Sequence, residues 1–153
     1  GTTTTLSSSD SPGHGNFIIN GTVSPYDWRS PRSDNLWQGI SGVNNPCPSG
    51  FRIPTSAEWV SLANSITNFT AATCGSTSTC LSVAYSSTLK LPSCGQREYF
   101  GNSFSGPDFY GTYWANTPNG SGGAYLLFFI SNNVVPANTY YRATGYSVRC
   151  IKD

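Results

Sequence analysis

The residues that could perform chemistry are few and scattered along the chain. Among 153 residues there are seven carboxylates, five cysteines and one histidine. His14 stands between two glycines without a G-x-S-x-G nucleophile motif, which favours a loop histidine over a catalytic base. No two cysteines have C-x-x-C spacing, and one histidine cannot complete a histidine-rich zinc site. We therefore expect no catalytic residue, no metal and no cofactor, and we predict that the protein is not an enzyme.

The carboxylates support this expectation. Glu58 is explained by helix capping, and Asp10 and Asp153 lie near the ends of the chain. A glycoside hydrolase needs two carboxyl groups that face each other across the scissile bond. The remaining four stand in no recognisable motif: Asp27, Asp34, Glu98 and Asp108.

Composition excludes several classes of partner. Only 10% of the residues are charged and the formal net charge is +1, so we expect no nucleic acid and no anionic membrane as a partner. No apolar run reaches the roughly 18 residues that span a bilayer. Serine and threonine together make up about a quarter of the chain, which is typical of secreted β-rich proteins. The chain begins at Gly1 without methionine or a signal peptide, as expected of a processed product.

The elements that would position these residues predict an α+β fold with one or two helices. The sequence TSAE at 55–58 is a capping box, in which Thr55 and Glu58 serve each other's backbone amides. An apolar stripe at helical spacing follows it: Trp59, Leu62, Ala63 and Ile66. Strands are predicted at residues 16–23, 81–85, 113–115, 124–130 and 146–151. The nearly continuous apolar run at 124–130 predicts a central strand of a small antiparallel sheet.

Residues 1–12 (GTTTTLSSSDSP) form a segment of their own, which we call the arm. One interpretation is a flexible linker. The other is an extended strand, because four consecutive threonines favour that conformation. Such a strand is long enough to cross a neighbouring subunit or to lie along an edge of its own domain. Its subunit contacts would be made by Thr2, Thr3, Thr4, Thr5 and Leu6.

Four ordered blocks resemble the Fibrobacter succinogenes major paralogous domain family. They are NNPCPSGFRIPTSAEW (44–59), LKLPSCGQR (89–97), GTYWAN (111–116) and GYSVRCIKD (145–153). The resemblance covers residues 13–153 and implies a single C-type-lectin-like domain with irregular loops, preceded by the arm. It also implies an exported or surface protein of Bacteroidetes-like or Fibrobacteres-like bacteria, with no established catalytic activity.

The cysteines are better explained by disulfides than by metal, and disulfides indicate an oxidising compartment. In a lectin-like domain, Cys47 before the helix and Cys150 in the last strand are well placed to tie the two ends together. Cys74 and Cys80 would close a short ring, which leaves Cys94 as a buried free thiol. The alternative pairs Cys74 with Cys94 and leaves Cys80 free.

A sugar site, if present, should be calcium-free, because the E-P-N or Q-P-D and W-N-D triplets of calcium-dependent lectins are missing. The aromatic candidates are Trp28, Tyr99, Tyr110, Tyr113, Trp114, Tyr140 and Tyr141. Trp114, like Trp59, falls in a family block and should pack in the core. Tyr140 and Tyr141 lie in a loop-like stretch and are the best candidates for glycan contact.

Modification by glycans is a further hypothesis. Sequons occur at Asn20, Asn68 and Asn119. The threonines at 2–5 and the serines at 7–9 are candidate O-glycan acceptors.

These observations lead to two functional hypotheses. The first is a structural subunit of an extracellular or cell-surface fibre, pilus-like, assembled head to tail when the arm of one copy adds to a sheet edge of the next. Its partner would be further copies of the same chain. The alternative is a calcium-independent glycan-binding module for cell adhesion, with carbohydrate as its partner.

Overall fold

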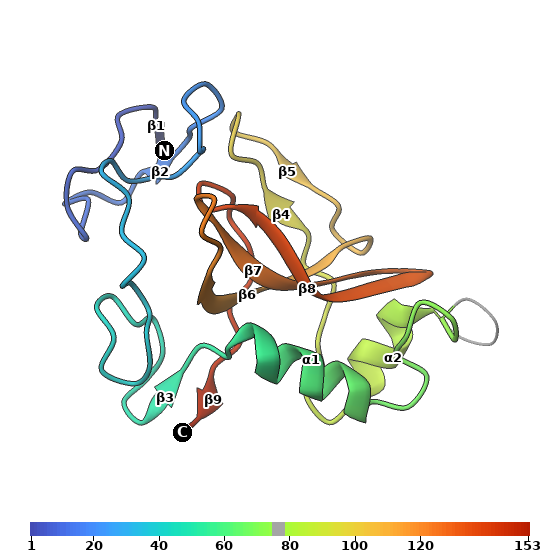
Figure 1. Ribbon diagram of the computed structural model, residues 1–153. Helices are drawn as coiled ribbons and strands as arrows, with labels where there is room; N and C mark the ends of the chain where they lie inside the picture. The colour runs from blue at the N-terminus through green and yellow to red at the C-terminus, as the bar shows by residue number, and fades with distance from the viewer. Residues whose placement is uncertain (75–78) are drawn as a thin grey trace.

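A three-stranded antiparallel sheet forms the centre of the molecule (Figure 1). The computed structural model describes residues 1–74 and 79–153. In the sheet, β7 (Gly123–Ile130) lies between β6 (Gly111–Pro118) and β8 (Asn133–Tyr141). The prediction of a central strand at 124–130 is therefore confirmed, and the predicted strand at 113–115 is the middle of β6. The mixed α+β class is confirmed as well.

The first helix follows the predicted capping box. α1 (Ser56–Ser65) starts after Thr55, whose hydroxyl accepts from the Glu58 amide (3.2 Å). The Glu58 carboxylate accepts in return from the Thr55 amide (2.8 Å). Trp59 and Ala63, four residues apart on the predicted stripe, are buried.

The second helix corrects the strand predicted at 81–85. Cys80–Ser86 forms α2 instead. The Thr79 hydroxyl caps it by accepting from the Ser82 amide (3.2 Å). Cys80 and Ala84 are both 0% exposed, as expected of residues four apart on one helical face. The signals for the helix, the capping residue Thr79 and the buried Cys80, come just before residues 81–85. The five residues taken by themselves do not distinguish a strand from a helix.

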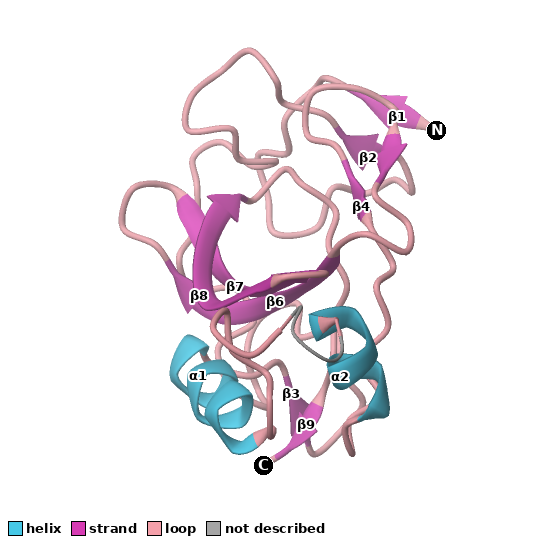
Figure 2. Ribbon diagram, turned by 90° about the vertical axis from the view of Figure 1, so that its right-hand side faces the viewer, coloured by secondary structure: helices cyan, strands magenta, loops and turns pink. Residues whose placement is uncertain are grey.

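Both helices cover the same face of the sheet, below it in Figure 2. The core fills the space between the helices and the sheet. It includes Trp59, Phe69, Leu91, Tyr113, Leu127 and Phe129. Phe129 packs edge-on against Phe69, with ring centroids 5.4 Å apart. The Trp59 indole donates to the Trp114 carbonyl (3.2 Å) and so anchors α1 to β6.

Three short strand pairs surround this core. β3 (Phe51–Arg52) pairs with β9 (Ile151–Lys152), and β4 (Gln96–Arg97) pairs with β5 (Phe104–Ser105), both antiparallel. β1 (Thr2–Thr3) pairs with β2 (Phe17–Ile18) in parallel. The strand predicted at 16–23 is thus reduced to two residues, and the one predicted at 146–151 is found only at its end, as Ile151–Lys152, because irregular loops take over the rest.

Two disulfides are present, as predicted. Cys47 is bonded to Cys150 at a sequence separation of 103, and Cys74 to Cys80 at a separation of 6. The alternative pairing of Cys74 with Cys94 is wrong. The expectation of a buried thiol at Cys94 is also wrong, because this cysteine is free and exposed. Leu91, three residues earlier, is the side chain of this segment that enters the core.

The disulfides fit the oxidising compartment predicted from the sequence. Within residues 1–74 and 79–153, no helix has the length and apolar character needed to cross a membrane.

Candidate functional site

The arm lies in an extended conformation along two segments of its own chain. At its start, the Phe17 and Ile19 amides donate to the carbonyls of Gly1 (3.1 Å) and Thr3 (2.8 Å). Farther on, the Ser7 amide donates to the Trp28 carbonyl (3.0 Å), and the Ser7 carbonyl accepts from the Ser30 amide (2.8 Å). Of the two predicted positions, the single chain therefore adopts the one along its own domain. We call segments 17–19 and 28–30 the acceptor edge.

Few side chains of the arm take part in this docking, and the main one is Asp10. Thr4 and Thr5 are exposed, and Leu6 is only half-buried. Asp10 forms an ion pair with Arg29, with Oδ1 and Nε 3.0 Å apart. Both of these atoms are shielded from solvent. Beyond Asp10, residues 11–16 are all exposed.

A cleft opens between the loop at 27–38 and the sheet. Its cavity volume is about 60 Å³, and its mouth is open to solvent. Three tryptophans line it together with polar side chains: Trp28, Trp37, Trp114, Asp34, Gln38, Asn116 and Arg142. The register of β6 against β7 shifts between Trp114 and Pro118, and irregularities of this kind re-aim side chains.

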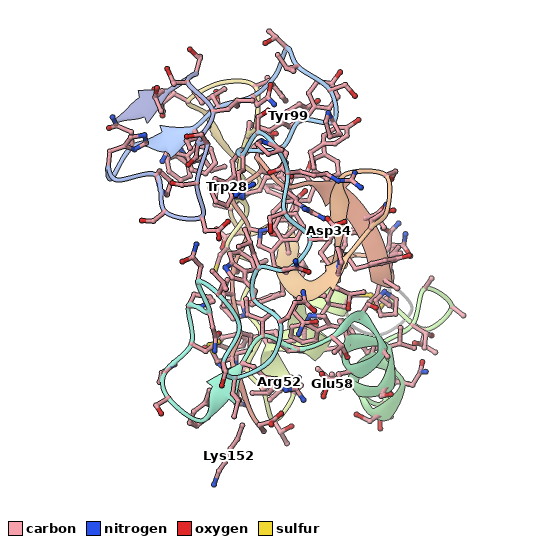
Figure 3. All side chains as sticks on the ribbon, turned by 60° about the vertical axis from the view of Figure 1, so that its left-hand side comes forward. Trp28, Asp34, Arg52, Glu58, Tyr99 and Lys152 are labelled. Atoms are coloured by element: carbon pink, nitrogen blue, oxygen red, sulfur yellow. A yellow bond between two sulfur atoms is a disulfide. The ribbon has the colours of Figure 1, made fainter. Side chains whose placement is uncertain are left out.

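Arg142 joins the two walls of this cleft. Its Nη2 donates to Asp34 Oδ1 (2.5 Å), and its Nη1 contacts Asp27 Oδ2 (3.4 Å) and donates to the Ser33 carbonyl (2.9 Å). Its Nε donates to the Gly123 carbonyl (2.9 Å). Burial raises the pKa of Asp27, whereas the hydrogen bond from Arg142 lowers the pKa of Asp34. Asp34 therefore stays ionised at the mouth of the cleft (labelled in Figure 3).

Sequence reasoning missed this cluster. Asp27 and Asp34 stood in no motif, and Arg142 lies 115 and 108 residues away from them. No local pattern pairs residues at such a separation, so only the folded chain brings them together.

Trp37 and Gln38 are held firmly at the rim. Trp37 adopts φ 64°, which is uncommon for a bulky residue and requires support from its surroundings. Its amide donates to the Val43 carbonyl (2.9 Å). Both Nε2 bonds of Gln38 are used, one to the Leu36 carbonyl (3.0 Å) and one to the Asn116 carbonyl (2.6 Å).

Tyr140 and Tyr141 do not lie in a loop. They end β8, where they pair with Ala124 and Gly123, because the strand extends farther than its sequence suggested. Both are half-buried among other rings, and Tyr141 lies 4.6 Å from Tyr26 and 4.9 Å from Tyr99 between centroids. Burial raises the pKa of Tyr99 and of Tyr140, so both stay neutral.

The other titratable candidates lie apart from one another. His14 is exposed and its Nδ1 accepts from the Asn16 amide (3.2 Å). Glu98 is buried and accepts from Gln96 (2.8 Å), whereas Asp108 is exposed. Glu58 lies beside Arg52 (Figure 3), with Oε1 2.7 Å from Nη2. In the part of the chain that the structure describes, no three histidine, cysteine or acidic residues form a group that could hold a metal ion.

The three sequons differ in accessibility. Asn20 is buried, and its side-chain amide donates to the carbonyls of Val23 and Asp27 (2.9 Å each). The Asn20 side chain is therefore not accessible to a glycan in the folded chain. Asn68 is exposed and Asn119 half-buried, and both remain candidate acceptors.

One family of known proteins matches most of the chain. The family model described as the Fibrobacter succinogenes major domain matches residues 23–152. No curated protein and no solved structure matches the chain. The arm and β2 precede the matched residues, whereas the cleft and both disulfides lie within them.

Proposed function

The chain belongs to the Fibrobacter succinogenes major domain family, and from this premise we propose that it is a structural subunit of an extracellular bacterial fibre. Copies assemble head to tail when the arm of one subunit leaves its own acceptor edge and docks on that of the next. The proposal rests on one observation above all: the arm precedes the family domain and is held mainly by backbone hydrogen bonds.

Backbone bonds favour exchange because a second copy reproduces them without loss. The bonds of Gly1, Thr3 and Ser7 to the acceptor edge need no particular side chain. An arm from another copy would form the same bonds and the same Asp10–Arg29 pair. Exchange of an identical element between subunits is a low-cost route to association.

The connecting segment supports an open chain of subunits. Residues 11–16 are exposed, and six extended residues reach about 20 Å. Each copy offers one arm and one acceptor edge, which are unlike surfaces. A contact between unlike surfaces that does not close into a ring builds a filament.

The C-type-lectin-like fold and the extracellular location belong to the same proposal. An early helix, a long irregular middle and a last strand tied back by Cys47–Cys150 support the fold. The two disulfides and the neutral, hydroxyl-rich composition support the location.

Deletion of residues 1–10 tests the proposal. The truncated chain should fold and remain monomeric, while the intact chain forms filaments visible by negative-stain electron microscopy. A matched control carries Thr4→Ser and Thr5→Ser, which leave the arm in place because both side chains are exposed. Filaments of the truncated chain would overturn the proposal.

Calcium-independent glycan binding for adhesion is a second candidate function. Aromatic rings and polar side chains gather at the cleft and around Tyr140 and Tyr141, a combination suited to the apolar and hydroxylated faces of sugars. A glycan array probed in the presence of EDTA tests it. Retained signal supports the candidate, and an array without any bound glycan counts against it.

A further inference from the structure

We propose that the cleft between the loop at 27–38 and β6 binds one neutral pyranose ring. Trp37 and Trp28 would pack on the C–H face of the ring, and Asp34, Gln38 and Asn116 would bond its hydroxyl groups. This inference rests on the glycan-binding candidate above and does not depend on exchange of the arm.

The balance of charge in the cleft excludes a strongly charged ligand. Two carboxylates and two guanidinium groups line the cleft: Asp27, Asp34, Arg29 and Arg142. Arg142 pairs with both aspartates, and Arg29 is paired with Asp10. An anion or a cation would have to displace these pairs, whereas a neutral ligand leaves them intact.

The polar groups of the rim are oriented by bonds that they already make. Arg142 holds Asp34 through Oδ1, which leaves Oδ2 to accept from a ligand, with only Arg32 near it at 3.6 Å. The two Nε2 bonds of Gln38 use both of its donors and present its Oε1 as an acceptor. The Asn116 side chain adds an amide donor. Vicinal hydroxyl groups, each a donor and an acceptor, match this set.

The aromatic side of the cleft supplies the apolar contact. Trp28 and Trp37 are half-buried, and Trp114 is 5% exposed. Trp37 is already half-buried in the free chain, so its indole has less rotamer freedom to lose than an exposed side chain when a ligand packs on it. The enclosed part of the cleft measures about 60 Å³, which is below the usual range for small-molecule pockets, so the ring would lie across the open mouth of the cleft. Because the cleft is open to solvent, it leaves room for the ring to belong to a longer chain.

The rival surface is the tyrosine cluster around Tyr140 and Tyr141. Its rings pack against one another, with centroids 5.1 Å apart for this pair. Those contacts use surface that a stacked sugar would need. The cluster therefore provides the matched control for the cleft.

Saturation-transfer NMR with the full chain tests the inference. The probes are the methyl pyranosides of glucose, galactose, mannose and N-acetylglucosamine, each at millimolar concentration with EDTA present. At least one should bind, and Trp37→Ala should weaken it tenfold or more. Asp34→Asn and Gln38→Ala should each weaken it several-fold, and Tyr140→Ala should leave it unchanged. If Trp37→Ala fails to fold, as judged by circular dichroism, the two polar variants decide.

The outcomes separate the two levels of the proposal. Binding that survives the cleft variants but is lost in Tyr140→Ala would overturn the cleft and keep the glycan-binding function. If none of the four probes binds to the wild-type chain but an array detects a longer glycan, the single-ring inference falls. If neither experiment finds a ligand, the glycan-binding function falls with it.

Discussion

The region before β3 and the region after it are held together in different ways. From β3 onward, the buried side chains are mostly large and apolar, among them Trp59, Leu127 and Phe129. Before β3, Ile18 is buried, but so are Ser7, Asn20 and Asp27. The first region therefore depends on hydrogen bonds and ion pairs, and the second on apolar packing between sheet and helices.

This difference bears directly on assembly. Apolar packing holds the core together because the buried side chains would be exposed to water if the elements separated. Backbone hydrogen bonds at an exposed edge can be replaced by bonds to water when the arm leaves, so their net contribution is small. In Figure 1 the N-terminal residues lie on the far side of the molecule from α2, away from the core. We therefore expect the core to stay folded when the arm is removed.

The largest effect should come from the bond that links the two regions. Replacing Cys47 and Cys150 by serine opens a loop of separation 103, at a cost of about 4–5 kcal/mol by chain entropy. Replacing Cys74 and Cys80 opens a separation of 6 and should cost about 2 kcal/mol. Urea unfolding, with Cys94→Ser in every variant to prevent new pairing, measures both. Equal costs would contradict the account.

A core variant and a truncation of the arm should differ in their effect on the free energy of unfolding. Phe129 is 0% exposed, and Phe129→Ala should lower the free energy of unfolding by about 3–5 kcal/mol. Deletion of residues 1–7 should change it by about 1 kcal/mol or less, because the lost backbone bonds are offset by the entropy of the freed chain. The same urea titrations compare the two. A deletion as damaging as Phe129→Ala would show that the arm belongs to the core.

A smaller effect is expected at the start of α1, within the apolar region. Thr55→Ala removes the cap and should cost about 1 kcal/mol. Hydrogen bonds from Arg52 lower the pKa of Glu58 from 4.5 to about 2. A carboxyl group with a lowered pKa in the folded state stabilises the fold above pH 4.5, and this contribution is lost as the pH falls towards 2.

Thermal unfolding between pH 2 and pH 6 measures this contribution. Glu58→Gln should flatten the loss of stability over that range, with Glu98→Gln as the comparison. An unchanged pH profile in Glu58→Gln would remove Glu58 from the explanation.

The sequence predicted those parts of the fold that are determined by residues close together along the chain. The capping box of Thr55 and Glu58 and the apolar run at 124–130 each lie within one element. The strand predicted at 81–85 failed because a five-residue alternation does not distinguish a strand from a short capped helix. Tyr140 and Tyr141 were placed in a loop because nothing nearby reveals how far β8 extends.

The candidate sites were harder to predict because they depend on distant residues. The clamp of Arg142 on Asp27 and Asp34 joins segments more than a hundred residues apart in sequence, with separations of 115 and 108. The acceptor edge is built from two separate loops. Only its donor, the threonine-rich arm, carries a signal in the sequence, as its β-branched residues favour an extended chain.

The charge pair between Asp10 and Arg29 provides the most direct test of arm exchange. Asp10→Arg and Arg29→Asp each place like charges at a partly buried contact, and neither protein should form filaments alone. Mixed in equal amounts, the two should co-assemble into alternating filaments, because every exchanged arm then meets the opposite charge. The double variant should assemble alone and serves as the control. Filaments in the mixture, seen by electron microscopy, are the predicted result. If the double variant forms filaments but the mixture forms none, exchange of the arm is contradicted.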